Sequence, residues 1–156
     1  DTFYIPTGRV HAIGAGVLLA EIQQTSDVTY RIYDYDRVDS KTGTKRQLHN
    51  ELAIHVIDYE VHDTYKTDYS IEKNVCNILV HSPYFRTNIL DINSTVEKDY
   101  SAIDSFIIYM CVEGSIEIVS EGETYTINNG ETLLIPATLN IISLKADNAK
   151  VLEVYY

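Results

Sequence analysis

A succession of short strand signals in the second half of the chain most constrains its fold. Each segment is a few residues long, rich in β-branched and aromatic residues, and bounded by turn residues such as those in Asn128-Asn129-Gly130. Many short strands at this spacing are typical of β-sandwiches and barrels. The predicted strands are Cys76–Val80, Phe85–Ile92, Phe106–Val112, Ser115–Val119, Thr124–Ile127, Glu131–Pro136, Leu139–Leu144 and Val151–Tyr155.

The first part of the chain carries two further strand patterns and one helical pattern. Apolar residues alternate along Val17–Gln23 and Val28–Tyr33, which predicts two strands. Within Gln47–Ile57, leucines and a valine recur at helical spacing and predict one short helix. We therefore expect an all-β protein with a single helix.

Composition excludes several classes of partner. The net charge of −11 and the pI of about 4.7 argue against a nucleic-acid surface, which needs clustered Lys and Arg, but not against a small anionic ligand. No apolar run is long enough to predict a membrane span. Cys76 and Cys111 form no CxxC spacing and suggest reduced thiols, so we expect a cytoplasmic protein. The sequence does not indicate an oligomeric state.

A weak internal repeat links the two ends of the chain. Asp1–Pro6 and Glu131–Pro136 each contain an acid, a threonine, three apolar residues and a proline. Aligning the two prolines places Ile141 opposite His11. This predicts two related barrels, with a ligand position in the first barrel and only core in the second.

Three N-terminal side chains are candidates for chemistry. His11 follows a rigid turn that starts at Pro6, and imidazole suits zinc, although a lone histidine is more often structural. Glu21 has apolar neighbours along its strand, which favours a buried carboxylate able to act as an acid or base. Arg31 can stabilise negative charge on a substrate, or can pair with Glu21 or Asp27 across adjacent strands. Asp27 follows a serine in a turn and is also read as a local cap.

The order of these residues carries a family resemblance. A strand followed by Pro-x-Gly-x-x-His, here ending at His11, resembles the second signature of cupin barrels. The longer strings Tyr4–Gly14 and Glu21–Arg37 resemble type I mannose-6-phosphate isomerases of the short bacterial kind, and Gly130–Ala137 is similar to the C-terminal barrel of that family. The resemblance covers essentially the whole chain but only the C-terminal half of the family's length.

The resemblance implies an organisation in three parts. Residues 1–40 would be the last strands of an incomplete catalytic cupin barrel, 41–75 a helix-containing linker, and 76–156 a smaller C-terminal cupin-like barrel of the jelly-roll type. The implied activity is the zinc-dependent interconversion of mannose 6-phosphate and fructose 6-phosphate through an enediol, with a small sugar phosphate as the partner.

The resemblance also assigns roles to residues. The family holds its zinc with a Gln, two His and a Glu, and His11 matches the last of these ligands. Arg31 matches the active-site pocket most securely and would stabilise the enediolate. Glu21 and Asp27 match acidic pocket positions and are candidates for the general base, Glu21 ahead of Asp27 for its expected burial, unless the base lies in the missing half.

Two other interpretations stay open. A non-enzymatic sugar-binding or regulatory cupin could use the same barrel without metal, and chelation should abolish isomerisation but leave simple sugar binding. The second interpretation concerns this polypeptide alone. The chain begins with Asp1 and its single methionine is Met110, so we expect that an upstream part has been removed. With one zinc ligand of four, the isolated chain is expected to bind zinc weakly and to be inactive.

Overall fold

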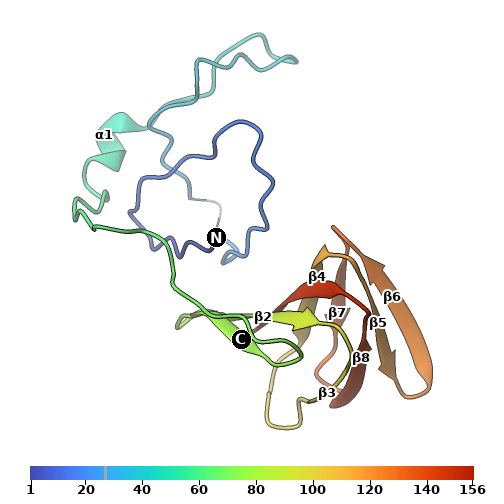
Figure 1. Ribbon diagram of the computed structural model, residues 1–156. Helices are drawn as coiled ribbons and strands as arrows, with labels where there is room; N and C mark the ends of the chain where they lie inside the picture. The colour runs from blue at the N-terminus through green and yellow to red at the C-terminus, as the bar shows by residue number, and fades with distance from the viewer. Residues whose placement is uncertain (27) are drawn as a thin grey trace. The chain divides into compact units, whose positions relative to one another are not determined.

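The computed structural model describes residues 1–26 and 28–156, which divide into two compact units. The barrel unit comprises Asp1–Tyr4 and Lys66–Tyr156, and the N-terminal unit comprises Ile5–Tyr65. Every strand of the described residues belongs to the barrel unit, and the helix α1 (Asn50–Ala53) belongs to the N-terminal unit (Figure 1).

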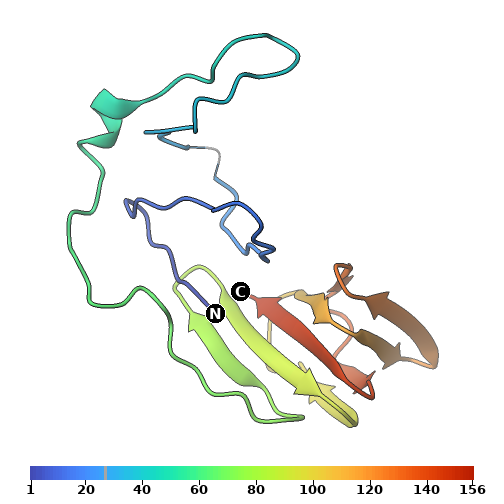
Figure 2. The ribbon, with the colours of Figure 1, turned by 45° about the horizontal axis from the view of Figure 1, so that its top comes forward.

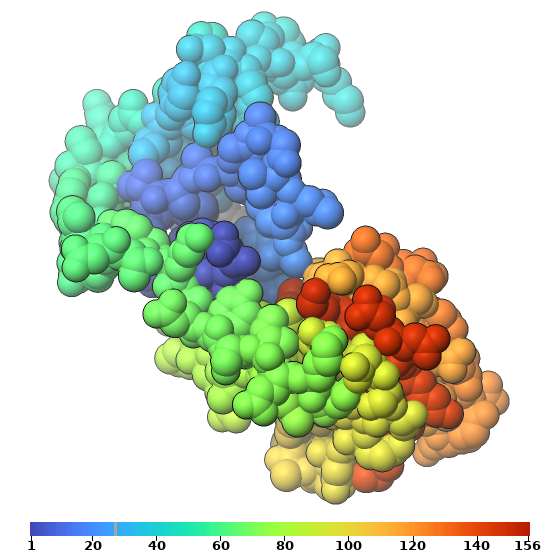
Figure 3. All heavy atoms as spheres, in the orientation of Figure 1, coloured from blue at the N-terminus to red at the C-terminus, as the bar shows by residue number. Residues whose placement is uncertain are grey.

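The barrel unit consists of two antiparallel sheets. The five-stranded sheet contains, in spatial order, β1 (Asn77–His81), β2 (Arg86–Ile92), β9 (Ala149–Tyr155), β4 (Ile107–Glu113) and β7 (Thr132–Ile135). The four-stranded sheet contains β3 (Thr95–Asp99), β8 (Ile141–Lys145), β5 (Ser115–Ser120) and β6 (Glu123–Asn128). Figure 2 shows β1, β2 and β9 side by side. In the space-filling view the residues from β1 onward, coloured green to red, form a closely packed body (Figure 3).

Alternate side chains of both sheets meet in one apolar core. Leu90 and Val151 from the five-stranded sheet and Ile118 and Leu144 from the four-stranded sheet are fully buried within it. Burying one such side chain contributes about 1.5–3 kcal/mol, so these layers supply most of the stabilisation of the unit. The predicted all-β class is confirmed.

The strands predicted after Cys76 are present, with ends shifted by a residue or two. Strand β3 was not predicted from the sequence, because the residues of β3, Thr-Val-Glu-Lys-Asp, do not alternate between apolar and polar side chains. Val96 and Lys98 are its half-buried positions, and the second of these is charged. A lysine at a core-facing position hides the period-two signal on which the prediction of a strand rests.

Glycine is required at the turn between β4 and β5. Gly114 has φ of 76°, and a Cβ placed on it would lie 2.2 Å from the carbonyl oxygen of Asn148. A larger residue would therefore meet both a strained backbone and a steric clash. The turn between β5 and β6 contains Glu121 and Gly122, both with positive φ, as two-residue hairpin turns prefer.

The N-terminal unit differs from the sequence-based expectation. The strands predicted over Val17–Gln23 and Val28–Tyr33 do not form among its described residues, so this prediction is wrong for the chain as it stands. Strands need a hydrogen-bonded neighbour, and the alternating pattern supplies only the faces of such a strand. Leu18 is 94% exposed, so the apolar face of the first segment is not buried.

The helix is shorter than predicted. Only Asn50–Ala53 is helical, and the apolar positions Leu48, Leu52 and Val56 that indicated a longer helix are all exposed. A helix of one turn gains little from propensity, and it lengthens only when its apolar face packs against another element. Among the described residues, no helix is long and apolar enough to cross a membrane.

The two segments of the internal repeat end in similar turns, but only the second segment forms a strand, β7. Arg9 donates its backbone N–H to the Pro6 carbonyl at 3.2 Å, and Leu139 donates in the same way to Pro136 at 3.0 Å. The prediction that Ile141 belongs to the core is wrong, because its side chain is 58% exposed. Successive strand residues face opposite sides, so the next residue of β8, and not Ile141, points into the core.

Candidate functional site

His11 projects from a turn that the structure holds in place. Gly8 has φ of 91°, and a Cβ on it would lie 2.6 Å from the Val56 carbonyl oxygen. The N–H of Asp58 donates to the Gly8 carbonyl at 2.9 Å and ties the turn to the segment after α1. His11 is exposed, and its Nδ1 lies 2.9 Å from the Arg9 carbonyl oxygen. A carbonyl only accepts, so Nδ1 carries the proton and Nε2 keeps a free lone pair in the neutral ring.

This tautomer leaves Nε2 available to bind a metal ion. Such histidines usually donate one ring N–H to a carbonyl or carboxylate and bind the metal with the other nitrogen. Within residues 1–26 and 28–156, no three His, Cys, Asp or Glu side chains are placed to hold a metal ion. His11 therefore fits zinc as one ligand, while structural and catalytic zinc sites take three or four protein ligands.

Arg31 is fixed through its backbone rather than through its charge. Its N–H donates to His49 Nδ1 at 3.1 Å, and its carbonyl accepts the N–H of His49 at 2.7 Å. Its Nη1 donates a long hydrogen bond of 3.4 Å to the Gln47 carbonyl. Among the described residues no carboxylate pairs with the guanidinium, so the alternative of an ion pair with Glu21 is not realised there. Arg31 thus combines a fixed backbone with a guanidinium that no described carboxylate neutralises.

The predicted carboxylates are less well defined. Glu21 is exposed, so its predicted burial is wrong for this chain. The reason is that the strand expected to bury it does not form. Asp27 lies outside the described residues. No hydrogen bond or ion pair joins His11, Glu21 and Arg31 to one another in the part of the chain that the structure describes.

A cluster that sequence reasoning missed lies directly after Arg31. The buried carboxylate of Asp34 accepts hydrogen bonds from Arg37 and Arg46, and Arg46 Nε lies 2.7 Å from Asp34 Oδ2. The hydrogen bonds from Arg46 and then Arg37 hold the pKa of Asp34 well below its usual range. Lys45 pairs with Asp36 at 2.6 Å. Lys45 and Arg46 are therefore both ion-paired within their own loop.

The barrel unit contains a second polar cluster, buried between its sheets. Register places Asn88 of β2 and Tyr109 of β4 on either side of Glu153 of β9, so the three side chains form a row across one sheet. Lys98 of β3 and Tyr100, which follows β3, reach this row from the four-stranded sheet. We call Cys76, Asn88, Lys98, Tyr100, Tyr109 and Glu153 the Glu153 cluster.

The two carboxylate oxygens of Glu153, a residue only 1% exposed, are surrounded by donors. Lys98 Nζ lies 2.7 Å from Oε1, and the hydroxyls of Tyr100 and Tyr109 also contact this oxygen. Asn88 Nδ2 donates to Oε2 at 2.8 Å, and the Cys76 thiol donates to it at 3.2 Å.

Burial and the neighbouring Lys98 charge shift the pKa of Glu153 in opposite directions. Desolvation raises the pKa of Glu153, but the charge of Lys98 and hydrogen bonds from Lys98, Tyr100 and Asn88 outweigh it, so the net pKa is lowered. Desolvation also raises the pKa of Tyr100 and of Tyr109 far above the usual range, so both hydroxyls keep their protons.

A weak signal of this cluster was present in the sequence. Glu153 interrupts the apolar alternation of Val151–Tyr155 at a position that faces the core. A charged residue there needs partners, because an isolated buried charge is very costly. The partners could not be named, since Lys98 lies on the strand that the sequence did not reveal.

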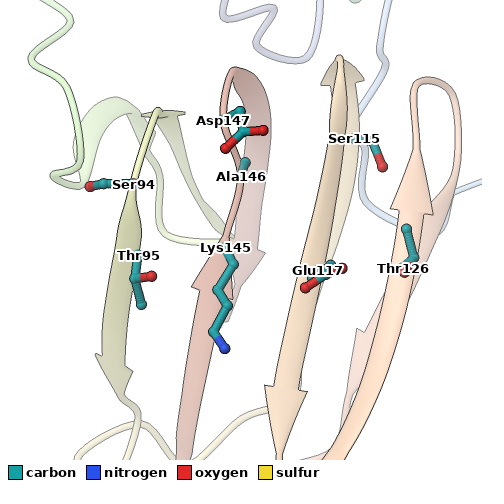
Figure 4. Close-up of a pocket in the computed structure, with 8 residues that line it drawn as sticks. All are labelled: Ser94, Thr95, Ser115, Glu117, Thr126, Lys145, Ala146 and Asp147. Atoms are coloured by element: carbon teal, nitrogen blue, oxygen red, sulfur yellow. The ribbon is translucent and has the colours of Figure 1, made fainter.

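A shallow polar groove of about 360 Å³ crosses the outer face of the four-stranded sheet (Figure 4). Thr95, Lys145, Glu117 and Thr126 stand in one row on β3, β8, β5 and β6, as their register requires. The charged members of the row, Lys145 and Glu117, are exposed. Ligand sites usually enclose their ligand with mostly apolar walls, so this groove lacks the character of a specific site.

Comparison with known proteins identifies the family. Residues 75–156 match the cupin domain of mannose-6-phosphate isomerase. The chain is 34% identical over 140 residues to the mannose-6-phosphate isomerase of Streptococcus mutans, covering 89% of this chain and 43% of the relative. It is 34% identical over 149 residues to mannose-6-phosphate isomerase ManA of Bacillus subtilis, covering 93% of this chain and 46% of the relative.

A solved structure supports the same relationship. The crystal structure of the mannose 6-phosphate isomerase from Bacillus subtilis aligns with a TM-score of 0.68 and 31% identity, over 84% of this chain and 41% of that chain. The chain thus spans less than half the length of the relatives that it matches. From its sequence, its two-sheet fold and these matches, the chain belongs to the mannose-6-phosphate isomerase family and contains that family's cupin domain.

Proposed function

We propose that the full-length gene product interconverts mannose 6-phosphate and fructose 6-phosphate, and that the N-terminal unit of this chain contributes to its active site. The observation that carries the proposal is the exposed Nε2 of His11, left free by the contact of Nδ1 with Arg9, in a chain related along most of its length to mannose-6-phosphate isomerases. In this proposal residues 1–40 belong to the catalytic barrel, and residues 76–156 form the C-terminal barrel.

His11 would hold a zinc ion through Nε2, together with ligands from the part of the family's length that this chain does not match. Zinc bound there would act as a Lewis acid on the oxygens of the sugar. The role of His11 itself is to present one correctly protonated ring, which the Arg9 carbonyl and the Pro6–Gly8 turn orient.

Arg31 would stabilise the negative charge that develops during isomerisation. The reaction moves a proton between adjacent carbons through an enediol, so charge builds on the substrate oxygens. A guanidinium that no described carboxylate neutralises, and whose backbone is fixed by His49, is suited to this task. The proton itself would be moved by Glu21, by Asp27 or by a residue outside this chain.

The proposal is tested with the full-length gene product carrying His11→Ala. We expect this change to lower the zinc content and to abolish isomerisation of mannose 6-phosphate. The matched control is His62→Ala, which removes a histidine that contacts Glu60 at 3.9 Å and the Tyr65 ring at 5.6 Å. The control should keep both zinc and activity. Full activity in His11→Ala would overturn the proposed metal role.

Chelation separates this enzyme from a metal-free sugar-binding protein of the same fold. We expect a chelator to abolish isomerisation and added zinc to restore it. The non-enzymatic alternative would be supported if the protein does not isomerise the sugar phosphate at all but still binds it after treatment with a chelator. The 156-residue chain alone should not isomerise mannose 6-phosphate, either with or without added zinc.

A further inference from the structure

The Glu153 cluster lies in the barrel unit and is separate from the residues assigned to isomerisation. Its carboxylate is buried between two sheets, yet it receives donors from β2, β3, β4, the residue after β3 and the residue before β1. An ionised carboxylate offers about four lone-pair positions, and here both oxygens are engaged. The arrangement therefore provides the hydrogen-bond donors that a binding site for a carboxylate needs.

Contacts other than Glu153 hold the donors in place. Asn88 Oδ1 lies 3.0 Å from His81 Nε2, which turns the amide so that Nδ2 faces the carboxylate. The backbone N–H of Tyr100 donates to the Asn140 carbonyl at 2.7 Å, and Lys98 Nζ lies 5.4 Å from the centre of the Tyr100 ring. Asn88, Tyr100 and Lys98 thus each have at least one contact besides Glu153 that favours their place in the cluster.

The cluster also reaches the surface. The Lys98 side chain is 15% exposed, and Cys76 and the neighbouring His81 are exposed residues, so the cluster lies close to solvent. Beyond its Cβ, a glutamate side chain consists of one methylene and one carboxylate. Glu153→Ala consequently leaves a polar space with the shape of acetate, lined by a cation and several hydrogen-bond donors.

We propose that Asn88, Lys98, Tyr100 and Tyr109 form a binding site for a small carboxylate, and that the chain fills this site with its own Glu153. The built-in carboxylate joins the two sheets and keeps other anions out of the barrel. When the side chain is removed, free acetate or formate takes its place.

The test uses the 156-residue chain carrying Glu153→Ala, with thermal unfolding followed by circular dichroism near pH 7. Sodium acetate is compared with sodium chloride at equal ionic strength. We expect acetate to raise the Tm of Glu153→Ala in a saturable way and to leave the unsubstituted chain unchanged, because only the variant has a vacant site. Benzoate, which is too large for the space, should have no such effect.

Two further variants make the result specific. Glu117→Ala removes an exposed glutamate from β5, and its Tm should not respond to acetate. Adding Lys98→Met to Glu153→Ala should abolish the response, because the cation is lost. If Glu153→Ala is unfolded, acetate should restore its β-sheet signal. No effect of acetate on Glu153→Ala, folded or unfolded, would overturn the proposal, as would an equal effect on Glu117→Ala.

Discussion

Lys98 and Glu153 belong to different sheets of the barrel unit, and their side chains meet at 2.7 Å with little solvent contact. Removing only the cation leaves the carboxylate buried and unpaired, which is more costly than losing a surface ion pair. We expect Lys98→Met to lower the free energy of unfolding by about 3 kcal/mol, measured by urea denaturation followed by circular dichroism.

Lys150 provides the matched control for this change. It pairs with Glu113 at 2.5 Å, but both side chains are partly or largely exposed. Lys150→Met should cost no more than about 1 kcal/mol. Equal costs for the two lysines would contradict the view that burial of the Lys98 pair decides its importance.

The same pair makes the stability of the barrel depend on pH. The folded-state pKa of Glu153 is lowered relative to the ordinary value of 4.5, so the unfolded chain binds the proton more readily. The stabilisation is therefore complete above pH 4.5 and is lost as the pH falls through the folded-state pKa. Glu153→Gln should show a flatter decline in urea midpoint below pH 4.5 than the unsubstituted chain.

Comparing the two proteins isolates this group, because Asp34 and the other carboxylates with lowered pKa values are present in both. Parallel curves for the two proteins across the acid range would show that Glu153 is not the group responsible.

Cys76 should be an unreactive thiol although the residue is exposed. Burial of the sulfur and the nearby charge of Glu153 raise its pKa to about 12. Only the thiolate attacks disulfide reagents, so labelling near neutral pH should be slower than for glutathione by roughly a hundredfold or more. The measurement is reaction with a chromogenic disulfide in a Cys111→Ser background, which leaves Cys76 as the thiol that reports.

Glu153→Gln in the same background should speed the labelling, since it removes the negative charge beside the thiol. A rate for Cys76 that matches glutathione and does not change with Glu153→Gln would show that the thiol is not held against the carboxylate.

The strands of the barrel unit could be predicted from the sequence, but the residues that they bring together could not. Turn residues such as Gly130 and the β-branched and aromatic residues of each segment predicted nearly every strand, because both signals are local. The position of Glu153 next to Asn88 and Tyr109 depends on cross-strand register, which no single segment encodes. The sequence therefore marked Glu153 as a buried charge that needs partners but did not identify them, even though every strand but β3 was predicted.

For the N-terminal candidates, the sequence predicted the family correctly but not the local structure. The order of His11, Glu21, Asp27 and Arg31 carried the family resemblance, and the family is confirmed. The strands expected to bring these residues together do not form among the described residues, because an alternating segment needs a neighbour for its backbone hydrogen bonds. The tautomer of His11 emerged only from the contact of its ring with the Arg9 carbonyl.

Asp34 should hold together the loop that follows Arg31. Its carboxylate binds both Arg37 and Arg46, and an isolated bridge between Val38 and Lys45 closes the loop. Asp34→Asn removes the charge that both guanidiniums share. We expect faster cleavage by trypsin after Arg37 and Arg46 and faster amide exchange across residues 34–46.

Asp36→Asn is the control, because this exposed carboxylate pairs, among the described residues, with Lys45 alone. It should change trypsin cleavage little in comparison with Asp34→Asn. Identical digestion patterns for Asp34→Asn and the unsubstituted chain would mean that the backbone of the loop is held without the carboxylate.

Arg31→Lys in the full-length gene product tests the proposed transition-state role. Lysine keeps the positive charge but loses the planar, multi-donor geometry, so we expect kcat/KM for mannose 6-phosphate to fall by roughly a hundredfold or more. The zinc content and Tm should be preserved, because the backbone hydrogen bonds of Arg31 with His49 do not involve the side chain. Arg86→Lys is the control, since Arg86 lies over the Tyr155 ring at 5.9 Å in the barrel unit. Equal activity of the two variants would contradict the proposed role and leave the Arg31 side chain only its contact with the Gln47 carbonyl. A selective loss of turnover at unchanged stability would place the guanidinium at the reacting sugar.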